Sequence, residues 1–308
     1  MSKLDRVAEN CVLGEGPHWD AATQALYFVD IVEKTILKYT PETGKVARAS
    51  VAPHQSSFVV PIEGKKDQFV TSLDDHLAII SWDGESDKVT VVEKLCIASC
   101  SDKSSNSNFN DAKCDSSGRL WAGAHVMDPL NIAKTEPLGS LYTFDNKRQL
   151  KSQVDNIKIA NGLAFNDKTK KMFHIDSLKG TVDQFDFDIT AGTVSNRKVW
   201  FTLQKLSIPG IPDGMTIDSD GNLWVAVFGG GRVLKVDGSK SETLLDTIDI
   251  PAEQVTSVAF GGKNLDELYV TTAAVEIQNK KPVRPVDGAV YKVTGTGSKG
   301  LPGASFKL

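Results

Sequence analysis

Short apolar, β-rich runs recur along the chain at nearly even intervals. They begin near Leu26, Gln68, Leu120, Met172, Leu223 and Leu268, with spacings of 42 to 52 residues. Turn-rich segments precede most of these runs, and segments with alternating apolar and polar residues often follow, as at 35–40 and 140–145. This alternation predicts half-buried antiparallel strands. No long segment shows a sustained helical apolar period, so we expect few helices.

Repeats of about 50 residues are typical of β-propellers, in which each repeat forms one four-stranded sheet. The six repeats therefore predict an all-β fold, a six-bladed β-propeller with four antiparallel strands per blade. A pair of β-sandwiches is the alternative, which the even spacing disfavours. Proline and glycine are scattered through turns rather than gathered in a linker, so we expect residues 1–308 to form a single domain.

One position of the repeat carries an oxygen donor four times. Glu15, Asn110, Asn161 and Asp213 each lie five residues before a polar loop residue, and each loop leads into an apolar run. In a closed ring of repeats, equivalent positions face one axis, so these side chains would converge there. Such oxygen donors suit Ca²⁺, Mg²⁺ or Mn²⁺. Asn-Gly at 161–162 and Asp-Gly at 213–214 are also common turn pairs, which is the alternative interpretation.

Composition and net charge limit the classes of partner that we expect for the chain. Hydrophobic residues make up 40% of its 308 residues and charged residues 24%, as in ordinary globular proteins. The net charge of −4 gives no long-range attraction to nucleic acid or to an anionic membrane. We see no secretory signal and no apolar stretch of membrane-spanning length, and we expect a cytoplasmic monomer. Its four cysteines fit neither a zinc pattern nor a disulfide scaffold, and we expect free thiols.

Several longer segments resemble a known family. GEGPHWD at 14–20, ANGLAF at 160–165, IPDGMTID at 211–218 and TSVAFGGKNLDELYVT at 256–271 are similar to gluconolactonases, regucalcin (senescence marker protein) and luciferin-regenerating enzymes. FVDIVEKTI at 28–36 and KGLPGASFKL at 299–308 resemble the insect members in particular. The resemblance covers nearly the whole chain and implies a six-bladed propeller that holds one divalent cation near its axis. It implies that Glu15, Asn161 and Asp213 bind the cation, and that Asn110 lies beside it and contacts substrate.

The third repeat departs from the family pattern. The family motif Arg-x-Asn-Asp-Gly-Lys reads here with Asn108 in place of Arg and Ala112 in place of Gly, and WAGAH at 121–125 brings in a histidine. Met127 stands where the sugar lactonases carry Glu. Arg and Glu grip hydroxyls and carboxylates, so their loss favours a more apolar or aromatic ligand over a sugar lactone. We expect the substrate to contact four side chains, namely Asn108, Asn110, His125 and Met127.

His125 allows two interpretations, a proton donor or acceptor in the pocket or a surface or packing residue. An open, oxygen-ligated cation would polarise a carbonyl oxygen and lower the pKa of bound water, with Asp213 or a neighbouring carboxylate as general base. No Gly-x-Ser-x-Gly elbow or supported Cys–His pair points to a metal-free nucleophile.

The sequence therefore predicts a hydrolase that depends on one divalent cation, Ca²⁺, Mg²⁺, Mn²⁺ or Zn²⁺, with Asp213 as its catalytic residue. Its substrate would be a small molecule, a lactone or related cyclic carbonyl compound, with an oxyluciferin-like heteroaromatic as one candidate. The alternative is a non-catalytic calcium-binding regulatory protein of the regucalcin type.

Overall fold

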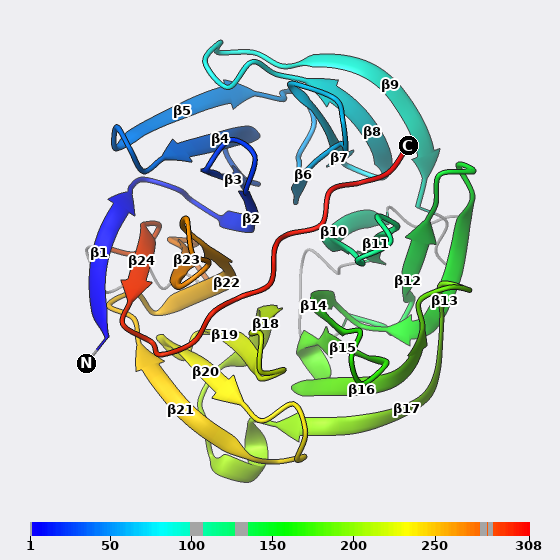
Figure 1. Ribbon diagram of the computed structural model, residues 1–308, viewed down its shortest axis with the longest axis vertical. Coiled ribbons are helices and arrows are strands. Elements are labelled where there is room, and N and C mark those ends of the chain that lie inside the picture. Colours follow the sequence, from blue (N-terminus) through cyan, green and yellow to red (C-terminus); the bar gives the residue numbers. More distant parts are fainter. Residues whose placement is uncertain (1, 99–106, 127–134, 278–281, 283–285) are drawn as a thin grey trace.

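The computed structural model describes residues 2–98, 107–126, 135–277, 282 and 286–308. Its strands form a ring of blades around a central axis (Figure 1). The innermost strands are β2 (Gly14–Asp20), β6 (Val59–Pro61), β10 (Asn108–Cys114), β14 (Ala160–Asn166), β18 (Ile211–Ile217) and β22 (Gln254–Gly261). The second strands are β3 (Ala25–Asp30), β7 (Gln68–Leu73), β11 (Leu120–His125), β15 (Lys171–Asp176), β19 (Leu223–Phe228) and β23 (Glu267–Ala273).

The third strands are β4 (Thr35–Thr40), β8 (His76–Ser81), β12 (Gly139–Phe144), β16 (Thr181–Asp188), β20 (Arg232–Val236) and β24 (Val290–Thr294). The outermost strands are β5 (Lys45–Ser50), β9 (Thr90–Ile97), β13 (Leu150–Ile157), β17 (Thr193–Thr202), β21 (Leu244–Asp249) and β1 (Lys3–Ala8). The part of the chain that the structure describes also contains two short 3-10 helices, η2 (Ser177–Lys179) and η3 (Gln204–Leu206).

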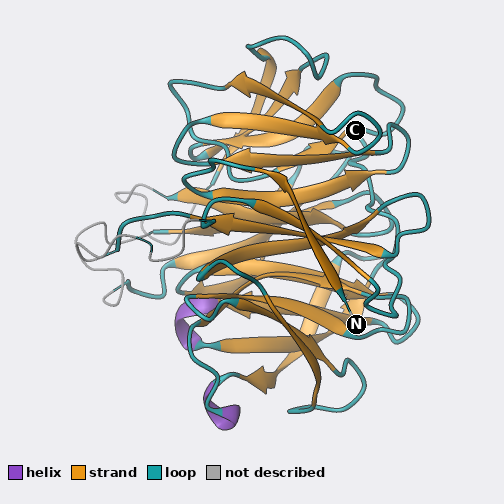
Figure 2. Cartoon of the chain, turned by 90° about the vertical axis from the view of Figure 1, so that its left-hand side faces the viewer, coloured by secondary structure: helices purple, strands orange, loops and turns teal. Residues whose placement is uncertain are grey.

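The predicted fold is confirmed, an all-β, six-bladed propeller with four antiparallel strands per blade. The six apolar runs are the second strands of the six blades, from β3 to β23. All six residues of β3 are buried, because neighbouring blades pack against both of its faces. Figure 2 shows the strands running across the thickness of the disc. None of the helices described here is long and apolar enough to cross a membrane.

Residues from the beginning of the chain complete the last blade. Strand β1 pairs antiparallel with β24, from Lys3 opposite Thr294 to Ala8 opposite Val290. It supplies the outermost position of the blade that begins with β22, so the two ends of the sequence close the ring (Figure 1). Closure of this kind covers a sheet edge that would otherwise be exposed.

Two blades repeat the same buried clamp. The indole N–H of Trp121 donates to the Asp115 carboxylate at 2.9 Å, and that of Trp224 donates to the Asp218 carboxylate at 3.0 Å. Both carboxylates also accept backbone N–H groups of their own turns. The tryptophans lie at equivalent positions of β11 and β19, so the sequence repeat reports a repeated hydrogen-bonded unit.

The C-terminal residues cross the ring over its central axis (Figure 1). The Ser219 N–H donates to the Lys299 carbonyl at 2.7 Å, which ties the tail to the fifth blade. Beyond the centre, the Phe306 N–H donates to the Pro61 carbonyl at 2.9 Å. The Phe306 ring is fully buried, with its centroid 5.9 Å from that of Phe144. We call residues 299–307 the strap, because they join blades on opposite sides of the ring.

Candidate metal and substrate site

Backbone irregularities place the predicted donors at one end of the inner strands. The pairing register shifts between Phe109 and Ala112 in β10, and equivalent shifts occur in β14 and β18. Asn110, Asn161 and Asp213 lie within these shifts, and in β2 the shift follows Glu15. A β-bulge bends a strand and re-aims its side chains, which is the local reason that these donors face the axis.

The two glycine pairs are parts of strands rather than turns. Asn161-Gly162 lies in β14 and Asp213-Gly214 lies in β18. A Cβ on Gly162 would meet the Met215 backbone nitrogen at 2.6 Å, and a Cβ on Gly214 would meet the Ser257 hydroxyl at 2.0 Å. The glycines therefore permit close approach between neighbouring inner strands, and the turn interpretation is wrong.

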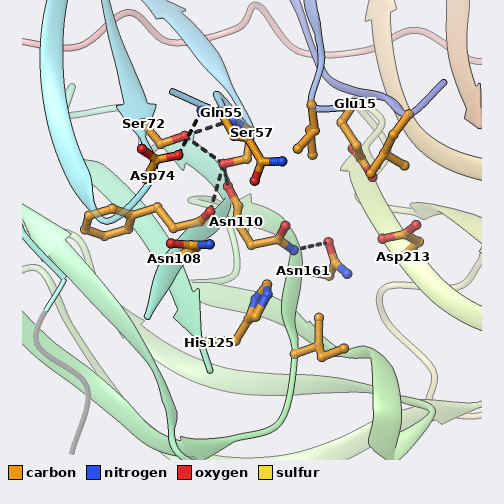
Figure 3. Close-up of a pocket in the computed structure, with 14 residues that line it drawn as sticks. Glu15, Gln55, Ser57, Ser72, Asp74, Asn108, Asn110, His125, Asn161 and Asp213 are labelled. Carbon is orange, nitrogen blue, oxygen red and sulfur yellow. Dashed lines mark hydrogen bonds between the residues drawn. The ribbon is translucent and has the colours of Figure 1, made fainter. Parts of the chain in front are cut away.

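The structure brings six of the seven predicted site residues into one pocket of about 220 Å³ (Figure 3). They are Glu15, Asn108, Asn110, His125, Asn161 and Asp213. The seventh, Met127, lies outside the described residues. Apolar side chains complete the wall, including Leu13, Ile31 and Ile159.

Hydrogen bonds fix how the two asparagines face the pocket. The Asn161 side-chain N–H donates to the Ser177 hydroxyl at 2.8 Å, which leaves its carbonyl oxygen toward Asn110. The Asn110 side-chain N–H donates to that oxygen at 3.0 Å and to the Ala160 carbonyl at 2.8 Å. An amide oxygen has two lone pairs, so the Asn161 oxygen keeps one for a cation. The Asn110 amide oxygen is likewise left for a ligand.

Burial raises the cost of charge on the two carboxylates. It raises the pKa of Glu15 well above its ordinary value, and the Asp213 and Asp111 carboxylates raise that pKa further. Burial likewise raises the pKa of Asp213, with a further contribution from Asp111. The charged groups that act on Glu15 and Asp213 are other carboxylates. No basic side chain among the described residues offsets their negative charge. A bound cation would relieve both groups at once.

The donor set fits a hard cation better than a thiophilic one. Among the described residues, no cluster of three or more His, Cys, Asp or Glu side chains is arranged to hold a metal. The groups that could hold a cation in this pocket are the Glu15 and Asp213 carboxylates and the amide oxygen of Asn161. Calcium and magnesium take such mixed oxygen ligands, whereas structural zinc sites use sulfur and nitrogen.

His125 lies in the pocket wall rather than on the surface. Only 7% of its surface is exposed, and burial lowers its pKa to about 4, so the ring is neutral at pH 7. Its Nδ1 atom is buried without a hydrogen-bond partner among the described residues. The neutral ring can therefore donate or accept a hydrogen bond with a ligand in the pocket.

Sequence reasoning missed several residues of this pocket. Ser57 lines it, and its hydroxyl donates to the Asn110 carbonyl at 2.7 Å. Asp74 lines it as well, and its carboxylate binds the His54 ring at 2.6 Å and the Gln55 N–H at 2.9 Å. Its neighbours in space come from another strand connection, and no sequence offset connects them.

Comparisons with known proteins place the chain in a family. A family model described as the SMP-30/gluconolactonase/LRE-like region matches residues 13–274. The chain belongs to this family. Regucalcin from Macaca fascicularis is 34% identical over 299 residues, which cover 97% of this chain and 96% of that protein.

Solved structures of the family agree in fold. A luciferin-regenerating enzyme is 42% identical, with a TM-score of 0.93 and complete coverage of both chains. A calcium-binding protein, regucalcin, from Agrobacterium tumefaciens has a TM-score of 0.83 at 23% identity and covers 98% of this chain and 97% of its own. The latter likeness supports the propeller fold alone.

Proposed function

We propose that this family member is a divalent-metal-dependent hydrolase of lactones or related cyclic carbonyl compounds. The observation that carries the proposal is the meeting of Glu15, Asn161 and Asp213 in one pocket, where two carboxylates lack a basic partner among the described residues. The presence of lactonases and a luciferin-regenerating enzyme among its relatives supports the same reaction class.

The pocket supplies groups for each step of ester hydrolysis. A divalent cation, when bound, supplies Lewis acidity toward a carbonyl oxygen and toward water. Asp213 accepts a proton from the attacking water as its oxygen bonds to the carbonyl carbon. When the ring C–O bond breaks, the Asp213 carboxyl group returns that proton to the departing alkoxide oxygen. The Asn110 amide orients the substrate, and the Asn161 N–H···Ser177 bond keeps the neighbouring amide oxygen toward the pocket.

The wall of the pocket favours a compact substrate with an apolar or aromatic part. No lysine or arginine lines it among the described residues, and His125 is neutral at pH 7. Leu13, Ile31 and Phe109 supply apolar surface instead. A sugar lactone has several hydroxyl groups that need partners, whereas a heteroaromatic cyclic carbonyl compound of the oxyluciferin type needs few.

Turnover of a lactone panel tests the proposal. The panel contains a sugar lactone, an aromatic lactone and an oxyluciferin-like compound, each with metal-free protein and with Ca²⁺, Mg²⁺, Mn²⁺ or Zn²⁺ added. We expect metal-dependent hydrolysis that favours the aromatic substrates and falls by about 10² or more in Asp213→Ala. Asp220→Ala, at an exposed turn of the same blade, is the matched control and should retain activity.

A calcium-binding regulatory protein is the second candidate. The regucalcin relatives, which match 97% of the chain, favour it, as does the loss of the family's Arg at Asn108. Tight calcium binding without turnover of any panel member would support this candidate and contradict the hydrolase. Metal-dependent turnover would exclude a purely non-catalytic role.

A further inference from the structure

A second cavity lies at the opposite end of the same inner strands. Its volume is about 460 Å³, within the range of about 300–1,000 Å³ that is usual for small-molecule sites. The pocket described above is lined by Asn108 at the start of β10 and by Asp213 in the first half of β18. This cavity is lined instead by Cys114 and Ile217, the last residues of those strands. The two cavities therefore open toward opposite faces of the disc.

The strap forms the roof of this second cavity. Residues 301–304 line it directly, between the anchor at Lys299 and the anchor at Phe306. Between these anchors, no backbone hydrogen bond ties residues 301–305 to the described part of the blades. A Cβ on Gly303 would meet the His18 ring at 2.9 Å, so the strap lies directly against the cavity wall. The backbone hydrogen bonds that hold this described part of the roof therefore lie at its two ends, and packing alone holds its middle.

The cavity wall combines a large apolar surface with one basic residue, Lys113, and one exposed acidic residue, Asp167. Trp19, Phe165 and Phe260 supply aromatic surface from three different blades. Lys113 contributes an ammonium group, which donates to the Met215 carbonyl at 2.6 Å. An ammonium group has three N–H donors, so two remain after this bond.

The Lys113 ammonium has no carboxylate within ion-pair distance among the described residues. Burial lowers its pKa to about 8, and the Asp111 carboxylate opposes this effect, so the group remains mostly charged at pH 7. His18, also in the wall, has its pKa lowered to about 4 by burial and is neutral. A partly buried cation beside an apolar cavity is most stable when an anion completes its shell.

We propose that the cavity under the strap is a second binding site, which takes an amphipathic monocarboxylate. The carboxylate of the ligand pairs with Lys113, and its apolar body lies between the aromatic walls and the Leu301–Ala304 part of the strap. This site depends neither on the cation nor on hydrolysis at the other face, so it stands or falls independently of the proposed function.

Calorimetric titration of the full chain with octanoate at pH 7 tests the proposal, with 1-octanol as an uncharged probe of equal chain length. We expect one saturable octanoate site and weaker binding of octanol by about tenfold or more, because the alcohol lacks the charge-assisted hydrogen bond. Absence of saturable octanoate binding overturns the site. Equal affinity for both probes overturns the assignment of a carboxylate ligand.

Variants locate the bound probe. Lys113→Met should weaken octanoate binding by about tenfold or more, whereas Lys168→Met, an exposed lysine on the same face, should leave it unchanged. Ala304→Phe, which narrows the cavity from the strap without altering a strand, should also weaken it and serves as the test if Lys113→Met does not fold. Asn108→Trp narrows the other pocket, and a loss of octanoate binding in that variant would overturn the proposal.

Discussion

At the scale of single residues, burial decides what the charged groups of this propeller can do. Asp213 is 7% exposed and close enough to Glu15 and Asp111 for their charges to interact. A buried carboxylate without a compensating cation favours its protonated form. A bound divalent cation would favour the ionised form of Asp213, which supports its proposed role as a cation ligand.

Calcium should stabilise the folded protein through Asp213. At a calcium concentration 100 times Kd, binding to the folded state adds about 2.7 kcal/mol, a rise in Tm of several degrees. We expect Asp213→Ala to lose most of this rise in a thermal melt, while the exposed control Asp220→Ala keeps it. An equal calcium-induced rise in wild type and Asp213→Ala would remove Asp213 from the cation site.

His174 makes the stability of the fourth blade sensitive to acid. It is fully buried, neither ring nitrogen has a hydrogen-bond partner among the described residues, and burial lowers its pKa to about 3. A histidine with a lowered folded-state pKa contributes stability above its unfolded pKa and loses it as the pH falls toward the folded value. Between pH 7 and pH 5, this linkage should cost about 2 kcal/mol.

Denaturant unfolding of His174→Leu and wild type at pH 7 and pH 5 measures this effect. We expect the variant to lose less stability on acidification, by about 2 kcal/mol. The raised pKa values of Glu15 and Asp213 act in the opposite direction, since their protonation favours the folded state at low pH. That contribution is common to both proteins and cancels in the comparison. Parallel loss of stability in the two proteins would contradict the assignment to His174.

At the scale of structural elements, the buried clamp explains how a turn is fixed to the strand after it. Asp115 is fully buried and accepts hydrogen bonds from the Ser117 N–H, the Arg119 guanidinium and the Trp121 indole, each at 2.9 Å. One carboxylate thus accepts hydrogen bonds both from its own turn and from the indole of the following strand. Removal of the carboxylate would leave these buried or partly buried N–H donors without a hydrogen-bond acceptor.

Asp115→Ala should therefore be far more costly than loss of an ordinary turn aspartate. We expect a loss of about 3–5 kcal/mol in unfolding free energy, as for one partner removed from a buried ion pair. Asp145, a half-buried turn residue whose carboxylate accepts backbone N–H groups from Lys147 and Gln149, is the matched control. Its alanine variant should lose about 1 kcal/mol. Equal losses in denaturant unfolding would show that the tryptophan clamp adds nothing.

At the scale of the whole molecule, chain segments far apart in sequence hold the ring together. Strand β1 completes the last blade, and the strap joins the fifth blade to the second across the axis. The strap lies on one face only, where its residues 301–304 line the second cavity. One face carries the candidate metal pocket, and the other carries the cavity that we assign to an amphipathic carboxylate.

The end of the strap should contribute strongly to stability. Phe306 is fully buried in the core shared by the second and third blades, and its truncation to alanine should cost about 3–5 kcal/mol. The neighbouring Lys307 forms an exposed ion pair with Glu63, and Lys307→Ala should cost less than about 1 kcal/mol. Chemical denaturation of both variants checks this difference. A small loss for Phe306→Ala would mean that the strap is not part of the cooperative fold.

The site could be predicted only where the repeat is regular. The five-residue offset identified Glu15, Asn110, Asn161 and Asp213, which the pocket brings together. It missed Ser57, because the residue five positions later is the apolar Ile62. Asp74 and Gln55 were missed for a different reason, since their places in the wall depend on contacts between separate strand connections.

The sequence alone determined the number of blades, the position of each second strand and the chemical type of the axial donors. These features repeat locally, and a local pattern of burial and polarity records them. Only the tertiary structure decided the bulges that aim the donors, the closure by β1 and the strap over a second cavity. The physical reason differs between these features. Closure and the strap depend on contacts between segments far apart in the chain, such as Lys3 with Thr294 and Phe306 with Pro61, which no local period encodes. The bulges lie between neighbouring strands, but an alternating apolar pattern does not show where the pairing register shifts.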